Sequence, residues 1–280
     1  MIHYRIMEKA DLPAALQLCR LAHWNQLARD WELFLNVSPD GCWVATKNGV
    51  VIGSVATVKY QEKFCWIGMV LVNPAERGQG IGTQLLQQAL TFLKEFETVK
   101  LDATPVGREV YVKLGFVDEY PLKRLQTKVS DQFLIETSAR PMTEKDLAAV
   151  GDFDEKIFGA SRRELLQWMF DGAREYSWLI EYDQAIKGFC LGRHGANFEH
   201  LGPIVAVDEA HARQLVSACL RNHIGREFIL DSLSHHSNWT DWLHEIGFVA
   251  QRPFMRMVCG NNQAGENSSR QFAIAGPEFG

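Results

Sequence analysis

The feature that most constrains the fold is an apolar segment that leads through a glycine-rich turn into an amphipathic helix. Residues 66–72 are apolar apart from Gly68, as in a buried strand, and Asn73-Pro74 ends the run. Apolar residues recur at helical spacing from Ile81 onward. Three glycines lie between strand and helix: Gly78, Gly80 and Gly82. This order of elements predicts a mixed α/β fold.

The turn has the chemistry of an anion-binding site. Glycines let a ligand approach the backbone closely, and the unpaired N–H groups of a first helical turn point toward a bound anion. Arg77 adds a positive charge. We therefore expect a phosphate or pyrophosphate here. A P-loop is excluded because Gly82-Thr83-Gln84 lacks the lysine, and the dinucleotide spacing G-x-G-x-x-G fails at Thr83.

The pattern Arg77-x-x-Gly80-x-Gly82, after a strand that ends in Val72-Asn73-Pro74, resembles the acetyl-CoA motif of the GCN5-related N-acetyltransferase (GNAT) superfamily. The resemblance implies acetyl-CoA as the co-substrate, and no metal is expected. It also implies a set of cofactor-binding residues in the strand end and the turn, which are Val70, Leu71, Val72, Arg77, Gly78, Gln79, Gly80, Ile81, Gly82 and Thr83.

A second motif lies further along the first half. Tyr111-x-x-x-Gly115-Phe116 matches the family pattern in which the tyrosine lies near the thiolate of CoA and acts as general acid. The expected order of elements in residues 1–130, β-α-α-β-β-β-α-β-α-β, is also the GNAT order. The base is less defined: Asp102 is a candidate, as is a water chain that ends on Asp102 or Asp231, or a substrate amine that arrives deprotonated.

Composition excludes several classes of protein. The chain has 280 residues, a net charge of −5 and a pI of about 6.0, which argues against a general nucleic-acid binder. Six scattered cysteines without a C-x-x-C spacing indicate a reducing compartment rather than a disulfide framework or a zinc site. No apolar run approaches the length of a membrane span, and no signal-peptide layout is present, so we expect a cytoplasmic protein without membrane partners.

The second half repeats the first. Arg5 and Asp11 recur as Arg140 and Asp146, and Leu101-Asp102 recurs as Leu230-Asp231. Trp43 and Gly53 likewise recur as Trp178 and Gly188, and Gly115-Phe116 recurs as Gly247-Phe248. We therefore predict two GNAT-like domains in tandem, each a mixed, mostly antiparallel twisted sheet flanked by helices. The predicted ranges are 1–128 for the catalytic domain, 134–260 for a degenerate domain and 261–280 for a tail whose apolar end docks on the body.

The copy has lost the catalytic motifs. Opposite the glycine turn lies a segment without glycine that carries Asp208 and Glu209, and acids there repel a pyrophosphate. Leu243 stands at the position of Tyr111. We expect one acetyl-CoA site, in the first half.

The acceptor pocket is predicted between the two early helices, the strand ends and the second domain. Trp24, Trp66 and Asp231 are the candidate substrate contacts, and Trp31 and Phe64 are further aromatic candidates that are as typical of a core. The adjacent His235-His236 pair lacks a third metal ligand and indicates a solvated loop.

The predicted function is an N-acetyltransferase for the amine of a small molecule or an amino-acid-like acceptor, in a monomer or homodimer. A CoA-binding sensor without turnover and an acyltransferase for a longer acyl-CoA are the alternatives. The expectation rests on the glycine turn together with Tyr111.

Overall fold

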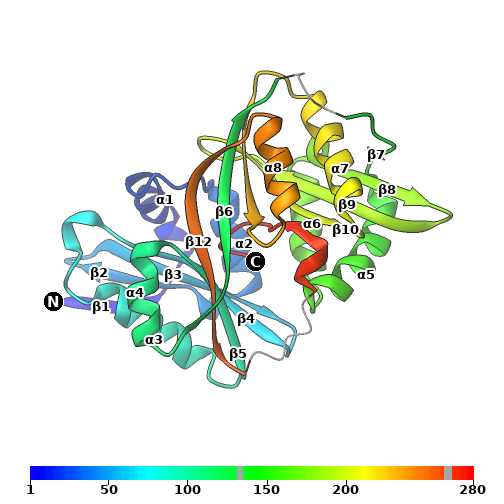
Figure 1. Cartoon of the computed structure of the whole chain (residues 1–280). Coiled ribbons are helices and arrows are strands. Elements are labelled where there is room, and N and C mark those ends of the chain that lie inside the picture. Colours follow the sequence, from blue (N-terminus) through cyan, green and yellow to red (C-terminus); the bar gives the residue numbers. More distant parts are fainter. Residues whose placement is uncertain (131–134, 262–266) are drawn as a thin grey trace.

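The computed structural model describes residues 1–130, 135–261 and 267–280. The first half follows the predicted order of elements (Figure 1). Its strands and helices are β1 (Ile2–Ile6), α1 (Leu12–Leu21), α2 (Ala28–Val37), β2 (Trp43–Lys47), β3 (Val50–Tyr60), β4 (Phe64–Val72), α3 (Ile81–Phe92), β5 (Thr98–Ala103), α4 (Pro105–Lys113) and β6 (Val117–Lys128).

The second half repeats this order, as the sequence repeats predict. Its elements are β7 (Arg140–Pro141), α5 (Leu147–Phe158), α6 (Arg163–Gly172), β8 (Trp178–Tyr182), β9 (Ala185–Arg193), β10 (Glu199–Ala206), α7 (Glu209–Arg221), β11 (Glu227–Leu233), α8 (Ser237–Glu245) and β12 (Val249–Gly260). A short strand β13 (Gln271–Ala273) follows in the tail.

The repeated residues make the same local contacts in both halves. Arg5 donates two hydrogen bonds of 2.7 and 2.8 Å to Asp11, whose carboxylate also accepts from the backbone N–H of Glu8. Arg140 donates two bonds of 2.8 Å to Asp146, which likewise accepts from a backbone N–H three residues earlier. The same sequence pattern therefore joins the first strand to the first helix of each half.

Two predicted helix limits are wrong. The helical spacing of Trp24, Leu27, Trp31, Phe34 and Leu35 predicts one helix, but this helix begins only at Ala28, because His23, with φ of 55°, turns the chain and leaves Trp24 in a loop. The apolar spacing after the glycine turn predicts a helix from about Gly80 to Glu97, but the helix ends at Phe92.

The described strands form one continuous sheet in which the two halves exchange a strand. The order is β1-β2-β3-β4-β5-β12-β6-β11-β13-β10-β9-β8-β7, so β12 of the second half lies between β5 and β6. β6 in turn pairs with β11 of the second half. Figure 1 shows β6 and β12 side by side at the centre of the molecule. Neither half therefore completes its sheet without the other.

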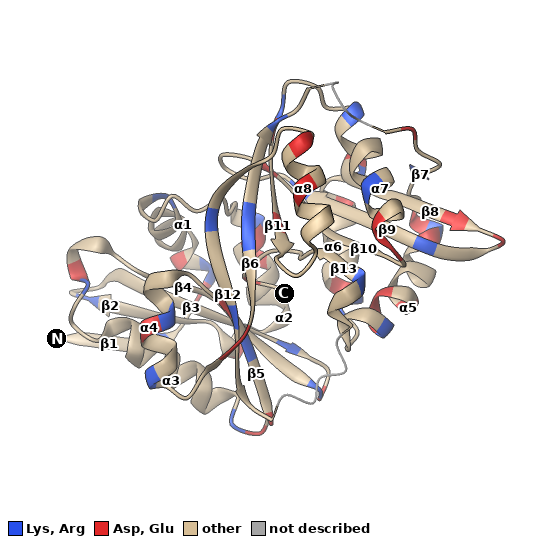
Figure 2. Ribbon diagram, viewed as in Figure 1, with Lys and Arg blue, Asp and Glu red and all other residues tan. Residues whose placement is uncertain are grey.

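Two buried ion pairs join the exchanged strands at equivalent positions. Arg256 on β12 donates two bonds of 2.9 Å to Asp102 on β5. Arg124 on β6 donates two bonds of 2.7 Å to Asp231 on β11. Basic segments are visible along both central strands in Figure 2. Each aspartate of the repeat is thus paired with an arginine of the other half.

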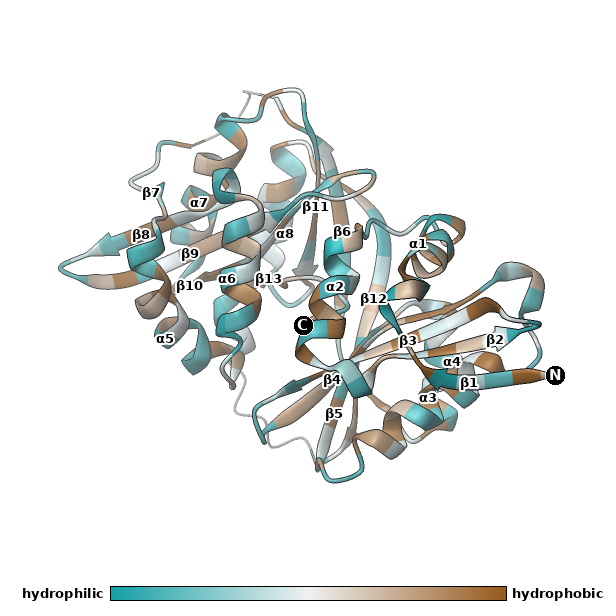
Figure 3. Cartoon of the chain, turned by 180° about the vertical axis from the view of Figure 1, so that it is seen from behind, coloured by the Kyte–Doolittle hydropathy of each residue, from teal (hydrophilic) through white to brown (hydrophobic). Residues whose placement is uncertain are grey.

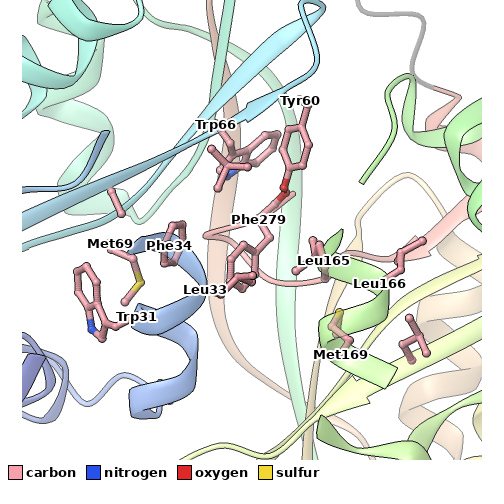
Figure 4. Close-up of a cluster of buried hydrophobic side chains, with 14 of the residues drawn as sticks. Trp31, Leu33, Phe34, Tyr60, Trp66, Met69, Leu165, Leu166, Met169 and Phe279 are labelled. Atoms are coloured by element: carbon pink, nitrogen blue, oxygen red, sulfur yellow. The ribbon is translucent and has the colours of Figure 1, made fainter. Parts of the chain in front are cut away.

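The hydrophobic core is continuous across the two halves. Figure 3 shows hydrophobic segments along β3, β4 and β9. The close-up in Figure 4 shows Phe279 between Phe34 on α2 and Leu165 on α6. The rings of Phe34 and Phe279 stack with their centroids 4.9 Å apart. The predicted docking of the apolar tail is confirmed, because Tyr60 and Trp66 also donate hydrogen bonds to tail carbonyls at 2.6 and 2.9 Å.

The division into ranges 1–128, 134–260 and 261–280 stays a prediction. Residues 131–134, at the predicted boundary, and 262–266, in the polar part of the tail, lie outside the described residues. The sheet itself crosses the boundary through the exchanged strands.

We predict that Asp231→Ala lowers the free energy of unfolding by about 3–5 kcal/mol, because it leaves the Arg124 guanidinium buried without its carboxylate. Burial alone would raise the pKa of Asp231, but Arg124 and His200 outweigh it and hold this pKa below its usual range. The stabilisation is therefore complete above the unfolded-state pKa and is lost as the pH falls through the folded-state value. Urea unfolding at pH 7 and at acidic pH measures both effects.

The matched control is Asp118→Ala, which removes the carboxylate of the exposed Arg108–Asp118 pair and should barely move the urea midpoint. Equal midpoint shifts for both variants would contradict a special role of the exchanged-strand pairs.

Candidate active site

The site begins where two parallel strands separate. β4 and β5 pair only at Cys65 with Val99 and at Trp66 with Lys100. Beyond these pairs the strands diverge, and a cavity of about 640 Å³ opens between them. Residues 67–72 of β4 line it on one side, and Asp102 and Thr104 line it on the other.

A distortion of β4 accompanies this opening. Met69 is buried yet has φ of 56°, in the left-handed region that a residue with a side chain rarely adopts. The pairing of β3 with β4 shifts register between Ser54 and Ala56, opposite Met69. The Ser54 hydroxyl donates a 2.9 Å hydrogen bond to the Met69 carbonyl and so fixes the strained peptide.

The glycine turn lies at the entrance of the cavity. Gly78 and Gly80 have φ of 80° and 76°, so a side chain at either position would be strained. Gly80 is the N-cap of α3, and no side chain of the described residues caps this helix. The N–H groups of its first turn are therefore available to an anion. The exposed Arg77 lies beside them, and its Nε donates to the Val72 carbonyl at 3.3 Å.

Most of the predicted cofactor residues line this one cavity. They are Val70, Leu71, Val72, Arg77, Gly78, Gly80, Ile81, Gly82 and Thr83. The Gln79 side chain instead donates to the Glu76 carboxylate at 2.8 Å, which Lys47 also binds. An open strand edge and an uncapped glycine turn fit a long ligand with a phosphate end, as acyl-CoA is.

Tyr111 lies on α4 on the far side of the same cavity. Its side chain is 9% exposed, and its ring packs against Phe116 with the centroids 6.0 Å apart. Thr104 begins this helix, because its hydroxyl accepts a 3.2 Å bond from the N–H of Gly107. Burial raises the pKa of Tyr111 well above its usual value, so the phenol keeps its proton at any working pH.

The other four predicted site residues, which are Trp24, Asp102, Asp231 and Trp66, do not all line the cavity. Trp24 lines the cavity from its loop, and Asp102 lines it with a carboxylate held by Arg256. Asp231 lies behind the wall, where it binds Arg124. Trp66 is a core residue at 1% exposure, bound to the tail through its indole N–H. Their predicted roles in catalysis and substrate binding stay predictions.

Several polar residues at the inner end of the cavity were missed by sequence reasoning. They are Gln26, Arg124, Arg252 and Glu278, with the aromatic ring of Phe254 between them. They come from the loop before α2, from the two exchanged strands and from the tail. No local motif marks them, since only the exchange of β6 and β12 and the docking of the tail bring them together.

In the second half the equivalent opening is filled by the chain itself. β10 and β11 pair in parallel only at Glu199 with Phe228 and at His200 with Ile229. Beyond this point β13 inserts and pairs with both strands. The helix that corresponds to α3 is capped by Asp208, which accepts from the N–H of His211 at 3.0 Å. Both the opening and the anion site are thus closed in this half.

Sequence profiles of known families match both halves. The profile of the Acetyltransferase (GNAT) family matches residues 8–116, and that of the Acetyltransferase (GNAT) domain matches residues 150–273. The chain therefore belongs to the GNAT superfamily and carries two GNAT domains in tandem. It is an acyltransferase with an acyl-CoA co-substrate and a small-molecule acceptor.

Two curated relatives resemble most of the chain. Holothin acyltransferase of Pseudoalteromonas sp. (strain SANK 73390) is 27% identical over 99% of this chain and 98% of its own length. The uncharacterized N-acetyltransferase YitH of Bacillus subtilis is 28% identical over 86% of each chain.

Solved structures share the fold. A crystal structure from Pyrococcus horikoshii superposes with a TM-score of 0.84 at 22% identity, over 100% of this chain and 96% of that one. A tandem GNAT protein from the clavulanic acid biosynthesis pathway has a TM-score of 0.66 at 12% identity, over 93% and 98%. At these identities the likeness concerns the fold alone.

Two further features concern only the described residues. No group of three or more His, Cys, Asp or Glu side chains lies close enough to hold a metal ion. No helix is long and apolar enough to cross a membrane.

We predict that Gly80→Ala weakens acyl-CoA binding about tenfold, because a side chain at φ of 76° costs roughly 1–2 kcal/mol or displaces the turn. Isothermal titration with acetyl-CoA or CoA measures the loss. Gly49→Ala is the matched control, since Gly49 has φ of 80° in a hairpin outside the cavity. Equal loss of affinity in both variants would show that the substitutions act by lowering the stability of the protein and not by changing the site.

A second prediction concerns the tail. A Cβ at Gly68 would lie 2.9 Å from the Cα and the carbonyl oxygen of Glu278, so Gly68→Ala should push the tail out of the cavity. The KM for the acceptor should rise roughly tenfold, which corresponds to a loss of about 1.4 kcal/mol of binding free energy. The affinity for acyl-CoA should be retained. An unchanged KM for the acceptor would show that the tail does not form part of the acceptor-binding pocket.

Proposed function

We propose that the protein is an acetyl-CoA-dependent N-acetyltransferase that acts on the amine of a small molecule or an amino-acid-like acceptor by direct attack in a ternary complex. The observation that supports this proposal most is that one cavity is lined by the uncapped glycine turn, by Tyr111 and by an inner chamber, the polar part formed by Gln26, Arg124, Arg252 and Glu278. A glycine turn alone would serve a binding module, whereas a protonated phenol inside the same cavity supports turnover. The names of the two curated relatives, an acyltransferase and an N-acetyltransferase, also support acyl transfer.

The proposed chemistry needs three contributions from the chain. The opening between β4 and β5 holds the thioester arm, and the backbone near Leu71 polarises its carbonyl. The neutral amine attacks this carbonyl, a C–N bond forms and the C–S bond breaks. Tyr111 gives its proton to the departing sulfur, and the proton lost by the amide nitrogen restores the phenol through solvent. The products are the N-acetylated acceptor and CoA.

The surroundings of Asp102 favour a structural role over that of a base. Its side chain is buried, and Arg256 holds both carboxylate oxygens at 2.9 Å. Arg256 also donates a 2.6 Å bond to the Tyr120 hydroxyl. A proton taken up by Asp102 would break this pair. We therefore propose that the amine reaches the site deprotonated or loses its proton to solvent.

The acetyl group, the monomeric or dimeric state and the cytoplasmic location are further parts of the proposal. The kcat/KM values of acetyl-CoA and of longer acyl-CoA esters, measured in the same assay, decide which acyl group the enzyme prefers. Size-exclusion chromatography with light scattering decides the oligomeric state.

We predict that Tyr111→Phe lowers kcat by about 10²–10⁴-fold with an unchanged Kd for acetyl-CoA, because only the acidic hydroxyl is lost. The measurement is release of CoA from acetyl-CoA against a panel of amines and amino acids. Gly80→Ala is the comparison, since it should lose affinity rather than kcat. Full activity of Tyr111→Phe would exclude the phenol as the acid, and no acceptor-dependent release with tight acetyl-CoA binding would favour a sensor.

A further inference from the structure

The inner chamber contains a guanidinium that lacks a counterion. Arg252 lies on β12 and lines the cavity. Its Nε is buried without a hydrogen-bond partner, and among the described residues no carboxylate lies within ion-pair distance of it. A buried polar atom is normally hydrogen-bonded, so an unpaired one beside a ligand cavity indicates that the ligand supplies the partner.

The neighbours of Arg252 strengthen its positive field. Arg124 lines the same chamber, and both guanidinium carbons lie 5.3 Å from the centroid of the Phe254 ring. Asp231 neutralises Arg124 through two bonds of 2.7 Å. Burial and, after it, the nearby Arg124 lower the pKa of Arg252 to about 10, so it stays charged at neutral pH. Asp231 and Glu278 raise this pKa again in part, but Asp231 pairs with Arg124 and Glu278 with Arg193, so Arg252 has no ion pair of its own among the described residues.

The same cavity also carries a buried carboxylate. Glu278 lines the chamber and is 3% exposed. It accepts a 2.9 Å bond from Gln26 and pairs with Arg193. Arg193 also pairs with Asp30, whose pKa is raised by burial. Glu278 keeps a pKa below its usual range, because Arg193 and His200 outweigh the effect of burial, and it is therefore ionised.

We propose that the acceptor is a zwitterion whose carboxylate binds Arg252 and whose amine lies beside Glu278. This inference rests on the proposed function and names the substrate class of the same site. A molecule with one negative and one positive group can pair with both the Arg252 guanidinium and the Glu278 carboxylate, which line the same cavity. A phosphate dianion fits less well, because Asp231 already neutralises Arg124 and leaves a single charge to balance.

The carboxylate is the group that the experiment isolates. Purified enzyme is assayed for CoA release with pairs of acceptors that differ only there, namely the common α-amino acids, β-alanine and γ-aminobutyrate against their carboxamides. Wild type should prefer at least one acid over its amide by about 10- to 100-fold in kcat/KM, as expected for one charge-assisted interaction. The carboxamides keep the amine and the side chain.

Three variants assign that preference to Arg252. Arg252→Gln should abolish it by lowering kcat/KM for the acid alone, whereas Arg252→Lys should keep part of it. Because Arg252 has no ion pair to lose and is repelled by Arg124, Arg252→Gln should not lower the urea midpoint. Arg270→Gln is the control, since Arg270 is exposed and lies outside the cavity.

Each result decides the proposal. Equal turnover of acids and amides, preference for amides, or a preference that persists in Arg252→Gln would overturn it. Turnover of none of these acceptors while acetyl-CoA binds would also overturn it, and would leave acyl transfer to another acceptor standing. Failure to bind acetyl-CoA would instead overturn the proposed function itself.

Discussion

The rest of the structure depends on the two buried arginine–aspartate pairs that fasten the exchanged strands. Asp102 with Arg256 and Asp231 with Arg124 lie at equivalent register positions and are both almost fully buried. Burying such charges costs several kcal/mol each, which only close bidentate pairing offsets. Because each pair joins a strand of one half to a strand of the other, neither half satisfies its buried charge alone. The two GNAT domains therefore share one sheet and the ion pairs within it.

The exchange also explains how a duplicated fold keeps one site. In the first half the opening between β4 and β5 remains a cavity, whereas in the second half β13 occupies the equivalent opening between β10 and β11. The tail then continues across to the first half, where Phe279 enters the core and Glu278 reaches the cavity wall. The second half thus contributes strand β12 and the tail to the half that contains the cavity.

Ion pairing distinguishes the arginines that stabilise the sheet from the arginine that can bind a ligand. Arg124 and Arg256 both have carboxylates at short distance and contribute chiefly to the sheet. Arg252 has none among the described residues, although it comes from the same strand as Arg256. A cation at an orphaned position gains most from an anionic ligand, since the cost of its desolvation is already met by the fold. Sequence alone cannot distinguish these arginines, because the carboxylates that pair with Arg124 and Arg256 lie on strands far away in the sequence.

Local sequence determined the elements and the cofactor motif of this protein. The strand before Asn73-Pro74, the glycines at positive φ and the helix of Tyr111 follow from steric and hydrogen-bonding preferences that act over a few residues. The repeat pattern likewise determined the tandem fold. The tertiary structure alone decided which strands pair, where the tail docks and what Asp102 and Arg252 contact. The ion pairs of Asp231 and Asp102 join residues 107 and 154 positions apart, and the hydrogen bond of Tyr60 to the tail joins residues 219 positions apart. Such distant partners are selected by packing and burial rather than by local preference.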